Sequence, residues 1–160
     1  MQVKDIMTQD AYICYETDTV ENVMAYMAKK KTSGLPIVDS EMHVVGFISD
    51  GDMMGFISRK RPILLDFYDH TSVIYDEVSF KEKLESLMKK NVMELATTRV
   101  VTVDAEDYVD EAAEILAKKK IKKLPVVDEN GKLVGVISRS TIVRSIMSDM
   151  IETFEGGKNE

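Results

Sequence analysis

The chain has 160 residues, a formal net charge of -7, and 44% apolar and 31% charged residues. This length suits one domain or two small, tightly associated ones, and the composition is typical of a globular protein. An acidic surface repels phosphate backbones, which argues against nucleic-acid binding. No apolar stretch approaches the roughly 18 residues of a membrane span, and a single cysteine cannot form an internal disulfide. We therefore expect a cytoplasmic protein with no membrane segment.

The sequence contains an internal repeat with an offset of 89 residues. Residues 35–49, LPIVDSEMHVVGFIS, align with residues 124–138, LPVVDENGKLVGVIS, with eight identities in fifteen positions. Upstream, VKDIM at 3–7 resembles NVMEL at 91–95, but the alignment of Met7 with Met93 requires an offset of 86. We therefore expect a repeat of about fifty residues with three residues gained or lost near its start.

Each copy predicts the element order β-α-β-β-α. Apolar residues recur at helical spacing from Val20 to Ala28, and the second copy repeats this stripe from Val109 to Ala117. Asp18 and Asp107 precede the two helices. They are expected to accept hydrogen bonds from the free N–H groups of the first helical turns.

Short strands follow each of these helices. Because proline cannot donate to a strand ladder, Pro36 and Pro125 are expected to stand at the first positions of strands. A sheet covered on one face by helices leaves its other face for a partner, and the second copy is the expected partner. The expected strands cover residues 37–39, 44–49, 126–128 and 133–138.

The chain is divided by this pattern into four parts, with the first repeat at 1–55 and the second at 91–147. Residues 56–90 contain a predicted helix from Phe80 to Lys90 and are too apolar for a flexible linker, so we expect a helical connecting segment packed on the pair. Residues 148–160 are the expected helix end and a tail that frays from Glu155.

The duplicated motifs resemble the CBS-domain family over residues 3–55 and 91–147. Leu-Pro-Ile/Val-Val-Asp is followed in both copies by Val-Gly-hydrophobic-Ile-Ser at the entry to the last helix. The resemblance implies an α/β (α+β) fold in which two β-α-β-β-α repeats pack sheet to sheet with pseudo-twofold symmetry. It also implies a homodimer of such pairs, with adenosine-containing ligands bound in the clefts between repeats.

The ribose-phosphate signature of this family, Gly-hydrophobic-x-Ser/Thr-x-x-Asp, matches GFISDGD at 46–52. Free N–H groups at a helix start and the Ser49 hydroxyl suit a phosphate, and the Asp52 carboxylate suits two ribose hydroxyls. Ser-x-x-Asp is also a helix-capping arrangement, and this alternative stays open. The resemblance assigns the first ligand site to Ser49, Asp52, Gly51, Phe47, Tyr12 and Gly34, with Tyr12 and Phe47 beside the base.

The second copy departs from the signature, because Thr141 stands where the ribose acid belongs. Positive charge is instead added by Lys122, Lys123 and Arg139. The first site is therefore expected to favour a monophosphate or S-adenosylmethionine, and the second a longer phosphate chain. A solvated basic face is the alternative. The resemblance assigns the second site to Ser138, Thr141, Arg139, Val136, Val101, Lys122 and Lys123.

Catalysis is not expected, because His43, His70 and Cys14 show neither catalytic nor metal-ligand spacing. We predict no metal site and no required cofactor. The predicted function is that of a stand-alone regulatory module that binds AMP, ADP, ATP or S-adenosylmethionine and signals to an unknown effector protein through a change in packing. The alternative is a ligand-free dimerisation module with vestigial pockets.

Overall fold

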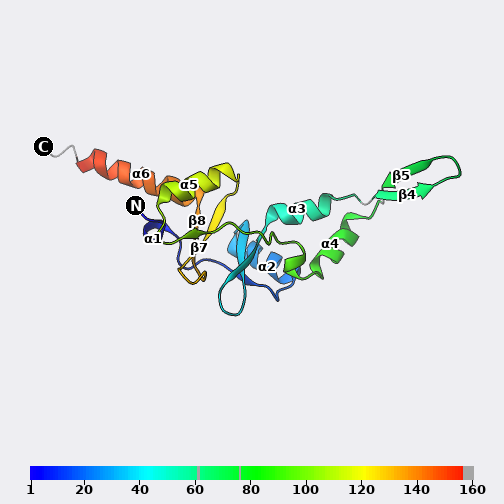
Figure 1. Ribbon diagram of the computed structural model, residues 1–160, viewed down its shortest axis with the longest axis horizontal. Coiled ribbons are helices and arrows are strands. Elements are labelled where there is room, and N and C mark those ends of the chain that lie inside the picture. Colours follow the sequence, from blue (N-terminus) through cyan, green and yellow to red (C-terminus); the bar gives the residue numbers. More distant parts are fainter. Residues whose placement is uncertain (61, 76, 157–160) are drawn as a thin grey trace.

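The computed structural model describes residues 1–60, 62–75 and 77–156. Both repeats have the predicted element order, preceded by a short helical turn (Figure 1). The first repeat contains α1 (Val3–Ile6), β1 (Cys14–Tyr15), α2 (Val20–Lys30), β2 (Gly34–Val38), β3 (Val44–Ser49) and α3 (Asp50–Ser58). The second contains η1 (Val92–Glu94), β6 (Val103–Asp104), α5 (Val109–Lys118), β7 (Lys123–Val127), β8 (Leu133–Ser138) and α6 (Arg139–Gly156).

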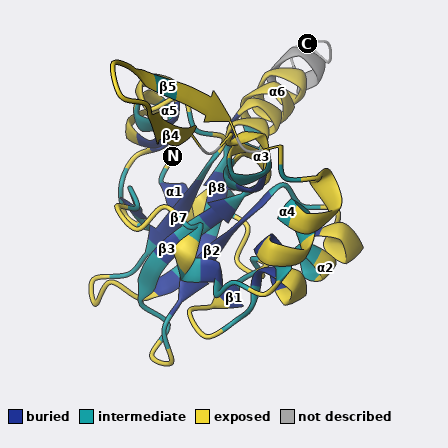
Figure 2. Ribbon diagram, turned by 90° about the vertical axis from the view of Figure 1, so that its right-hand side faces the viewer, coloured by how far each residue is buried: buried dark blue, intermediate teal, exposed yellow. Residues whose placement is uncertain are grey.

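Each repeat forms a three-stranded mixed sheet. β1 runs parallel to β2, which runs antiparallel to β3, and β6, β7 and β8 repeat this arrangement. The buried strands of both sheets lie together at the centre of the molecule, and α2 and α4 lie to one side of them (Figure 2). The two repeats therefore pack sheet to sheet with pseudo-twofold symmetry, which confirms the expected fold class.

Pro36 lies inside β2 rather than at its first residue, and Pro125 lies likewise inside β7. Each strand begins two residues before its proline. Pro36 is opposite Phe47, whose N–H and C=O groups are both bonded to Thr97 at 2.9 Å on the other side of the strand. The position opposite Phe47 therefore needs no backbone donor, and a proline fits there without the loss of a ladder bond.

The segments that precede the two sheets are exchanged between the repeats. Val3 donates its backbone N–H to the carbonyl of Asp107 in the second repeat, and Val92 donates to the carbonyl of Asp18 in the first, each at 2.9 Å. Both valines are fully buried. At about 1.5–3 kcal/mol for each buried side chain, this exchange contributes to holding the two repeats together.

Two threonines continue the exchange at the sheet edges. Thr8 and Val136 exchange both backbone hydrogen bonds at 2.9 and 3.0 Å, and Thr97 and Phe47 do the same at 2.9 Å. Thr97 follows Thr8 by 89 residues, so the repeat offset of 89 extends through the opening segment. The offset of 86 predicted there is wrong, because it was based on similar apolar residue types. The equivalent positions are those that make the same hydrogen bonds in the two repeats.

The structure has two hydrophobic cores, and each takes a buried valine from the opposite repeat. The core of the second repeat consists of Val3, Val103, Val109, Ala112, Leu116, Leu124, Val126, Ile137 and Ile142. The core of the first consists of Cys14, Val23, Met27, Leu35, Ile37, Ile48, Met53 and Val92. The apolar stripes predicted on α2 and α5 supply helical members of both cores, and Met53 of α3 and Ile142 of α6 add to them.

Asp18 and Asp107 do not cap the helices, contrary to expectation. The Asp18 carboxylate accepts from the N–H of Tyr15 at 2.8 Å, and Asp107 accepts from Asp104 at 2.9 Å. Both acids lie one residue before the N-cap position, so their side chains close the preceding turn. Thr19 caps α2 by accepting from the Asn22 N–H.

The connecting segment contains a hairpin that sequence analysis did not predict. β4 (Pro62–Asp66) pairs with β5 (Thr71–Tyr75), and the hairpin extends away from the body (Figure 1). Most of its residues are exposed. The expectation of a helical segment packed on the pair is wrong for this part, where β-branched and aromatic residues favour a strand.

The rest of the connecting segment is α4 (Phe80–Met88), which begins at Phe80 as predicted and contacts α2 and α3. Leu87 on this helix is buried. At the other end of the molecule, α6 continues beyond the body to Gly156 (Figure 1). Part of the tail expected to fray, residues 157–160, lies outside the described residues.

Candidate functional site

Two clefts lie between the repeats, and both repeats line each of them. The Ser49 cleft has a volume of about 560 Å³. Its walls are Ser33, Gly34, Phe47 and residues 49–52 of the first repeat, with Thr97, residues 99–101, residues 119–123 and Pro125 of the second. The Ser138 cleft has a volume of about 410 Å³, with walls from Thr8, residues 10–12, residues 30–34, Pro36, Lys123, Val136 and Ser138.

Ser49 and Asp52 stand where β3 ends and α3 begins. Ser49 is the N-cap residue of α3, and Asp52 Oδ2 accepts from its backbone N–H at 2.8 Å and from its hydroxyl at 2.9 Å. The Asp52 N–H in turn donates to Ser49 Oγ at 3.4 Å. The capping arrangement that was left open is therefore present. Within the described residues, Asp52 Oδ1 accepts no hydrogen bond, so the carboxylate can cap the helix and still receive hydroxyl donors.

The same capping box recurs away from both clefts, at the start of α4. Glu82 accepts from the backbone N–H of Ser79 at 3.0 Å and from its hydroxyl at 2.9 Å, and these bonds lower the pKa of Glu82. A Ser-x-x-acid box is thus no evidence of a ligand by itself. Ser49 and Asp52 differ from Ser79 and Glu82 in lining an inter-repeat cleft.

The apolar walls of the clefts combine residues that sequence analysis had assigned to different sites. Phe47 lines the Ser49 cleft together with Val101, whereas Tyr12 lines the Ser138 cleft together with Val136. The predicted pairing of Tyr12 with Phe47, and of Val101 with Val136, is therefore wrong. The cause is the exchange of opening segments, which carries each first-strand residue to the cleft of the other repeat.

Gly34 and Gly51, both predicted as ligand residues, line the Ser49 cleft, and Gly34 also lines the Ser138 cleft. A Cβ atom on Gly34 would lie 2.9 Å from Cε1 of Phe47 and 3.2 Å from the carbonyl oxygen of Ile48. Only glycine therefore allows the Phe47 ring to lie against this strand.

Positive charge gathers in the Ser49 cleft and comes from the second repeat. Lys122 and Lys123, assigned to the second site from the sequence, line this cleft beside Arg99, Lys119 and Lys120. The expectation of little positive charge near Ser49 is therefore wrong. Arg99 is not among the predicted ligand residues, because its place in this cleft depends on the crossing of its segment to the other repeat.

Lys123 lies between the two clefts and lines both. Its ammonium donates to the Thr32 hydroxyl at 2.7 Å and to the Gly34 carbonyl at 3.3 Å, across the repeat boundary. Burial lowers the pKa of Lys123, and the nearby carboxylate of Asp50 opposes this shift. Lys123 is equivalent to Gly34 in the first repeat. A cation therefore stands at only one of these two equivalent positions, and it lies at the boundary between the clefts.

The Ser138 cleft keeps the helix cap but lacks the acid. Ser138 Oγ accepts from the Thr141 N–H at 3.1 Å and lies 2.9 Å from the Thr141 hydroxyl. Arg139, predicted as a ligand residue, donates to the carbonyls of Ile121 at 2.7 Å and Leu116 at 3.1 Å. The Arg139 guanidinium is thus engaged at the end of α5, where it lines neither of the two clefts.

Tyr12 has partners of its own within the protein. Its ring meets that of Tyr26 edge to face at 6.0 Å between centroids, and the Lys30 ammonium lies 5.2 Å from the Tyr12 centroid. These contacts hold an exposed aromatic ring at the wall of the Ser138 cleft.

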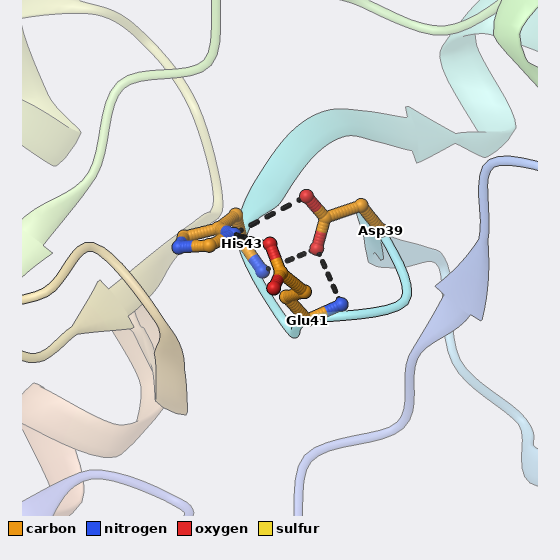
Figure 3. A group of neighbouring side chains, drawn as sticks. All are labelled: Asp39, Glu41 and His43. Carbon is orange, nitrogen blue, oxygen red and sulfur yellow. Dashed lines mark hydrogen bonds and ion pairs between the residues drawn. The ribbon is translucent and has the colours of Figure 1, made fainter.

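One further cluster, Asp39, Glu41 and His43, brings potential metal-ligand atoms within 4.8 Å of one another (Figure 3). Asp39 Oδ1 accepts from the N–H groups of Glu41 and His43, each at 2.9 Å. These bonds, that of His43 foremost, lower the pKa of Asp39. Asp128, at the equivalent place in the second repeat, accepts from two backbone N–H groups in the same way. The cluster is therefore accounted for by the turn between β2 and β3.

Cys14 is buried in the core of the first repeat. Burial raises the pKa of the Cys14 thiol to about 12, so the thiolate needed for nucleophilic chemistry is scarce near neutral pH. In the part of the chain that the structure describes, no helix is both long and apolar enough to cross a membrane.

Relatives align with nearly the whole chain. Protein MJ1426 of Methanocaldococcus jannaschii, described as uncharacterized, is 29% identical over 157 residues, and the match covers 92% of both chains. CBS domain-containing protein CBSX1, chloroplastic, of Arabidopsis thaliana is 30% identical, and the match covers 91% of this chain and 64% of that protein. Enzymes also match, but the chain spans only 24% of a homoserine O-acetyltransferase from Methanococcus vannielii and 19% of an inosine-5'-monophosphate dehydrogenase from Halalkalibacterium halodurans.

Solved structures share the fold. CBSX2 in complex with AMP superposes with a TM-score of 0.72 at 24% identity, covering 93% of this chain and 98% of that one. The CBS domain pair of protein MJ0100, in complex with 5'-methylthioadenosine and S-adenosyl-L-methionine, gives 0.67 at 22% identity with the same coverage. A family model described as the CBS domain matches residues 3–59 and 92–148. The chain therefore belongs to the CBS domain family.

Proposed function

We propose that this chain is a regulatory CBS pair that binds an adenine nucleotide or adenosyl ligand in the Ser49 cleft. The observation that carries the proposal is the Asp52 carboxylate, which lines the cleft and has one oxygen that receives no hydrogen bond from the described residues. A ribose offers two neighbouring hydroxyl donors, which a carboxylate accepts well. The complexes of CBSX2 with AMP and of MJ0100 with S-adenosyl-L-methionine support an adenosyl ligand.

The remaining walls of the Ser49 cleft suit the other parts of such a ligand. Phe47 and Val101 offer apolar surface to a base, and the basic side chains of Arg99 and Lys122 offer donors to a phosphate. The basic residues come from the second repeat, so a nucleotide would touch both repeats at once. A ligand that binds one packing of the repeats more tightly shifts the population toward it, and we propose that an effector protein reads this change.

We further propose that the module works as a homodimer in the cytoplasm. Exposed apolar side chains recur at helical spacing along α6, which supports a partner surface there. They are Val143, Ile146, Met147, Met150 and Ile151. Sedimentation equilibrium tests this part: a single species at the mass of one chain across the concentration range would contradict it.

The test of ligand binding is a thermal-unfolding panel with AMP, ADP, ATP and S-adenosylmethionine, followed by calorimetric titration of each ligand that stabilises the protein. A ligand at a hundred times its dissociation constant adds about 2.7 kcal/mol of stability. We expect Asp52→Asn to weaken binding at least about tenfold, because a charged acceptor for two hydroxyls is lost.

Asp52→Asn also weakens a helix cap, so the matched control is Glu82→Gln, which weakens the same capping box at α4. Both variants are expected to lose some stability through the weakened cap, but only Asp52→Asn is expected to lose affinity. Equal affinities in the two variants would place the site elsewhere. If no ligand stabilises the wild type, the ligand-free dimerisation module becomes the better account.

A further inference from the structure

The two clefts carry opposite charges at one pair of equivalent positions. Arg99 follows Asp10 by the repeat offset of 89 residues. Arg99 lines the Ser49 cleft, and Asp10 lines the Ser138 cleft. Each residue lies two positions after the threonine that pairs with the opposite sheet, Thr97 or Thr8. The exchange of segments therefore presents a guanidinium to one cleft and a carboxylate to the other from the same place in the fold.

The Arg99 side chain is available for a ligand. It is exposed and forms no hydrogen bond or ion pair with any described part of the chain. Lys119, Lys120 and Lys122 line the same cleft, and their ammonium groups likewise have no acceptor among the described residues. A protein of net charge -7 has many carboxylates to offer. The four cations around this cavity have no carboxylate partner among the described residues, so together they form a local positive field.

Cations of the Ser138 cleft are fewer and partly engaged. Lys30 lies over the rings of Tyr12 and Tyr26, at 5.2 and 5.9 Å from their centroids. Lys123 is bonded to Thr32, on the wall of this cleft. Lys31 and Asp10 also line this cleft, which gives it three cations and one acid, whereas five cations and two acids, Asp50 and Asp52, line the Ser49 cleft. Each phosphate that a ligand adds would therefore gain less Coulomb attraction here than in the Ser49 cleft.

We propose that Arg99 selects an adenosine ligand with two or three phosphates for the Ser49 cleft, and that Asp10 disfavours such a ligand in the Ser138 cleft. This rests on the proposed function, because Ser49 and Asp52 must hold the nucleoside at one side of the cleft. The phosphate chain then runs toward cations of the second repeat. Attraction grows with each phosphate, whereas adenosine itself gains nothing from Arg99.

The test is calorimetric titration of adenosine, AMP, ADP and ATP, without divalent cations, into the wild type and three exposed-site variants. The wild type is expected to bind ATP more tightly than AMP. Arg99→Asp is expected to weaken ATP binding about tenfold and to leave adenosine binding within about twofold. Arg99→Lys, which keeps the charge, is expected to retain most of the ATP preference. Asp10→Arg is expected to strengthen ATP binding at the Ser138 cleft.

Melting temperatures without ligand should be the same in all four proteins, because neither Arg99 nor Asp10 has a side-chain partner in the described residues. An ATP-to-AMP affinity ratio that is unchanged in Arg99→Asp, or a wild type that prefers AMP, overturns the inference and leaves the proposed function standing. A wild type that binds none of the four compounds also overturns the inference, and the proposed function falls with it if S-adenosylmethionine does not bind either.

Discussion

The Ser49 cleft and the Ser138 cleft occupy equivalent places about the pseudo-twofold axis. Their backbone contacts are alike, but several of their side chains differ in charge. Both keep a capping serine, a small residue two positions after it (Gly51 or Ser140), and a threonine from the opposite repeat paired at the sheet edge. The residues that differ in charge are at the cavity wall or helix start, in the equivalent pairs Asp52 and Thr141, Asp50 and Arg139, Arg99 and Asp10, Gly34 and Lys123, and Ser33 and Lys122.

This difference separates two kinds of constraint. Ser49 and Ser138 are needed in both repeats because each begins a helix that needs its free N–H groups satisfied. The fold does not require an acid at the position of Asp52, because the equivalent residue of the second repeat, Thr141, contacts its capping serine through a hydroxyl. A carboxylate at this position of the helix start in only one repeat is therefore better explained by what the cleft binds than by the fold.

The largest expected effect tests whether the two halves tolerate the same change. Gly135→Ala would place a Cβ 2.9 Å from the Thr8 carbonyl oxygen and 2.8 Å from Met7 Sδ. Because Thr8 is backbone paired to the sheet, we expect a loss of about 1–3 kcal/mol in the free energy of unfolding.

Gly46→Ala is the matched variant in the first repeat, and its Cβ would meet Cδ1 of Ile37 at 3.1 Å, the end of a flexible side chain. A smaller loss, below about 1 kcal/mol, is expected. Urea unfolding measures both. A larger loss in Gly46→Ala would contradict the account of segment exchange, in which Thr8 is held firmly against β8.

The next effect concerns the missing acid. Thr141→Asp is expected to recreate the capping box and to give the Ser138 cleft an acceptor for ribose, raising its affinity for adenosine about tenfold. Adenosine is the probe in this titration because it carries no negative charge that Asp10 would repel. The control is Thr141→Asn, which has similar size and no charge. Equal gains in the two variants would show that the carboxylate is not what distinguishes the clefts.

The smallest effect concerns the cation shared by both clefts. Lys123→Met removes two hydrogen bonds between repeats and is expected to cost less than about 1.5 kcal/mol at pH 7. Burial lowers the folded-state pKa of Lys123 below its unfolded value of 10.5. The unfolded chain then binds more protons between these two pKa values, so wild-type stability should rise relative to Lys123→Met as the pH increases through that window.

Urea unfolding from pH 7 to pH 10.5 measures this difference. If the stabilities of the wild type and Lys123→Met change in parallel with pH, Lys123 is not held in the partly buried position described. The variant also provides a check on the clefts, because Lys123 lines both and its loss should weaken phosphate binding in each.

The sequence was sufficient for the fold because the repeat is expressed in local patterns. The apolar stripes of α2 and α5, the strands around Pro36 and Pro125, and the signature at 46–52 can all be recognised without tertiary contacts. The composition of each cleft could not be predicted, since it depends on the crossing of residues 1–8 and 90–97 between repeats. Tyr12 and Val101 were assigned to the wrong clefts, and Arg99 was missed, for this one reason.

The β4–β5 hairpin was missed for a different reason. Its apolar residues occur on both faces of the two strands, without the alternation that marks a half-buried strand. Arg139 shows a third limit, because its charge suggested a phosphate ligand, whereas its guanidinium binds the carbonyls at the end of α5. Charge is visible in a sequence, but the acceptors that engage it are not.

The most direct test of the two unequal clefts is a crystal structure of the protein grown with AMP. The account predicts a nucleotide in the Ser49 cleft, with its ribose hydroxyls on the Asp52 carboxylate and its base between the apolar walls at Phe47 and Val101. An AMP molecule found only in the Ser138 cleft, or one in the Ser49 cleft whose ribose does not contact Asp52, would contradict it.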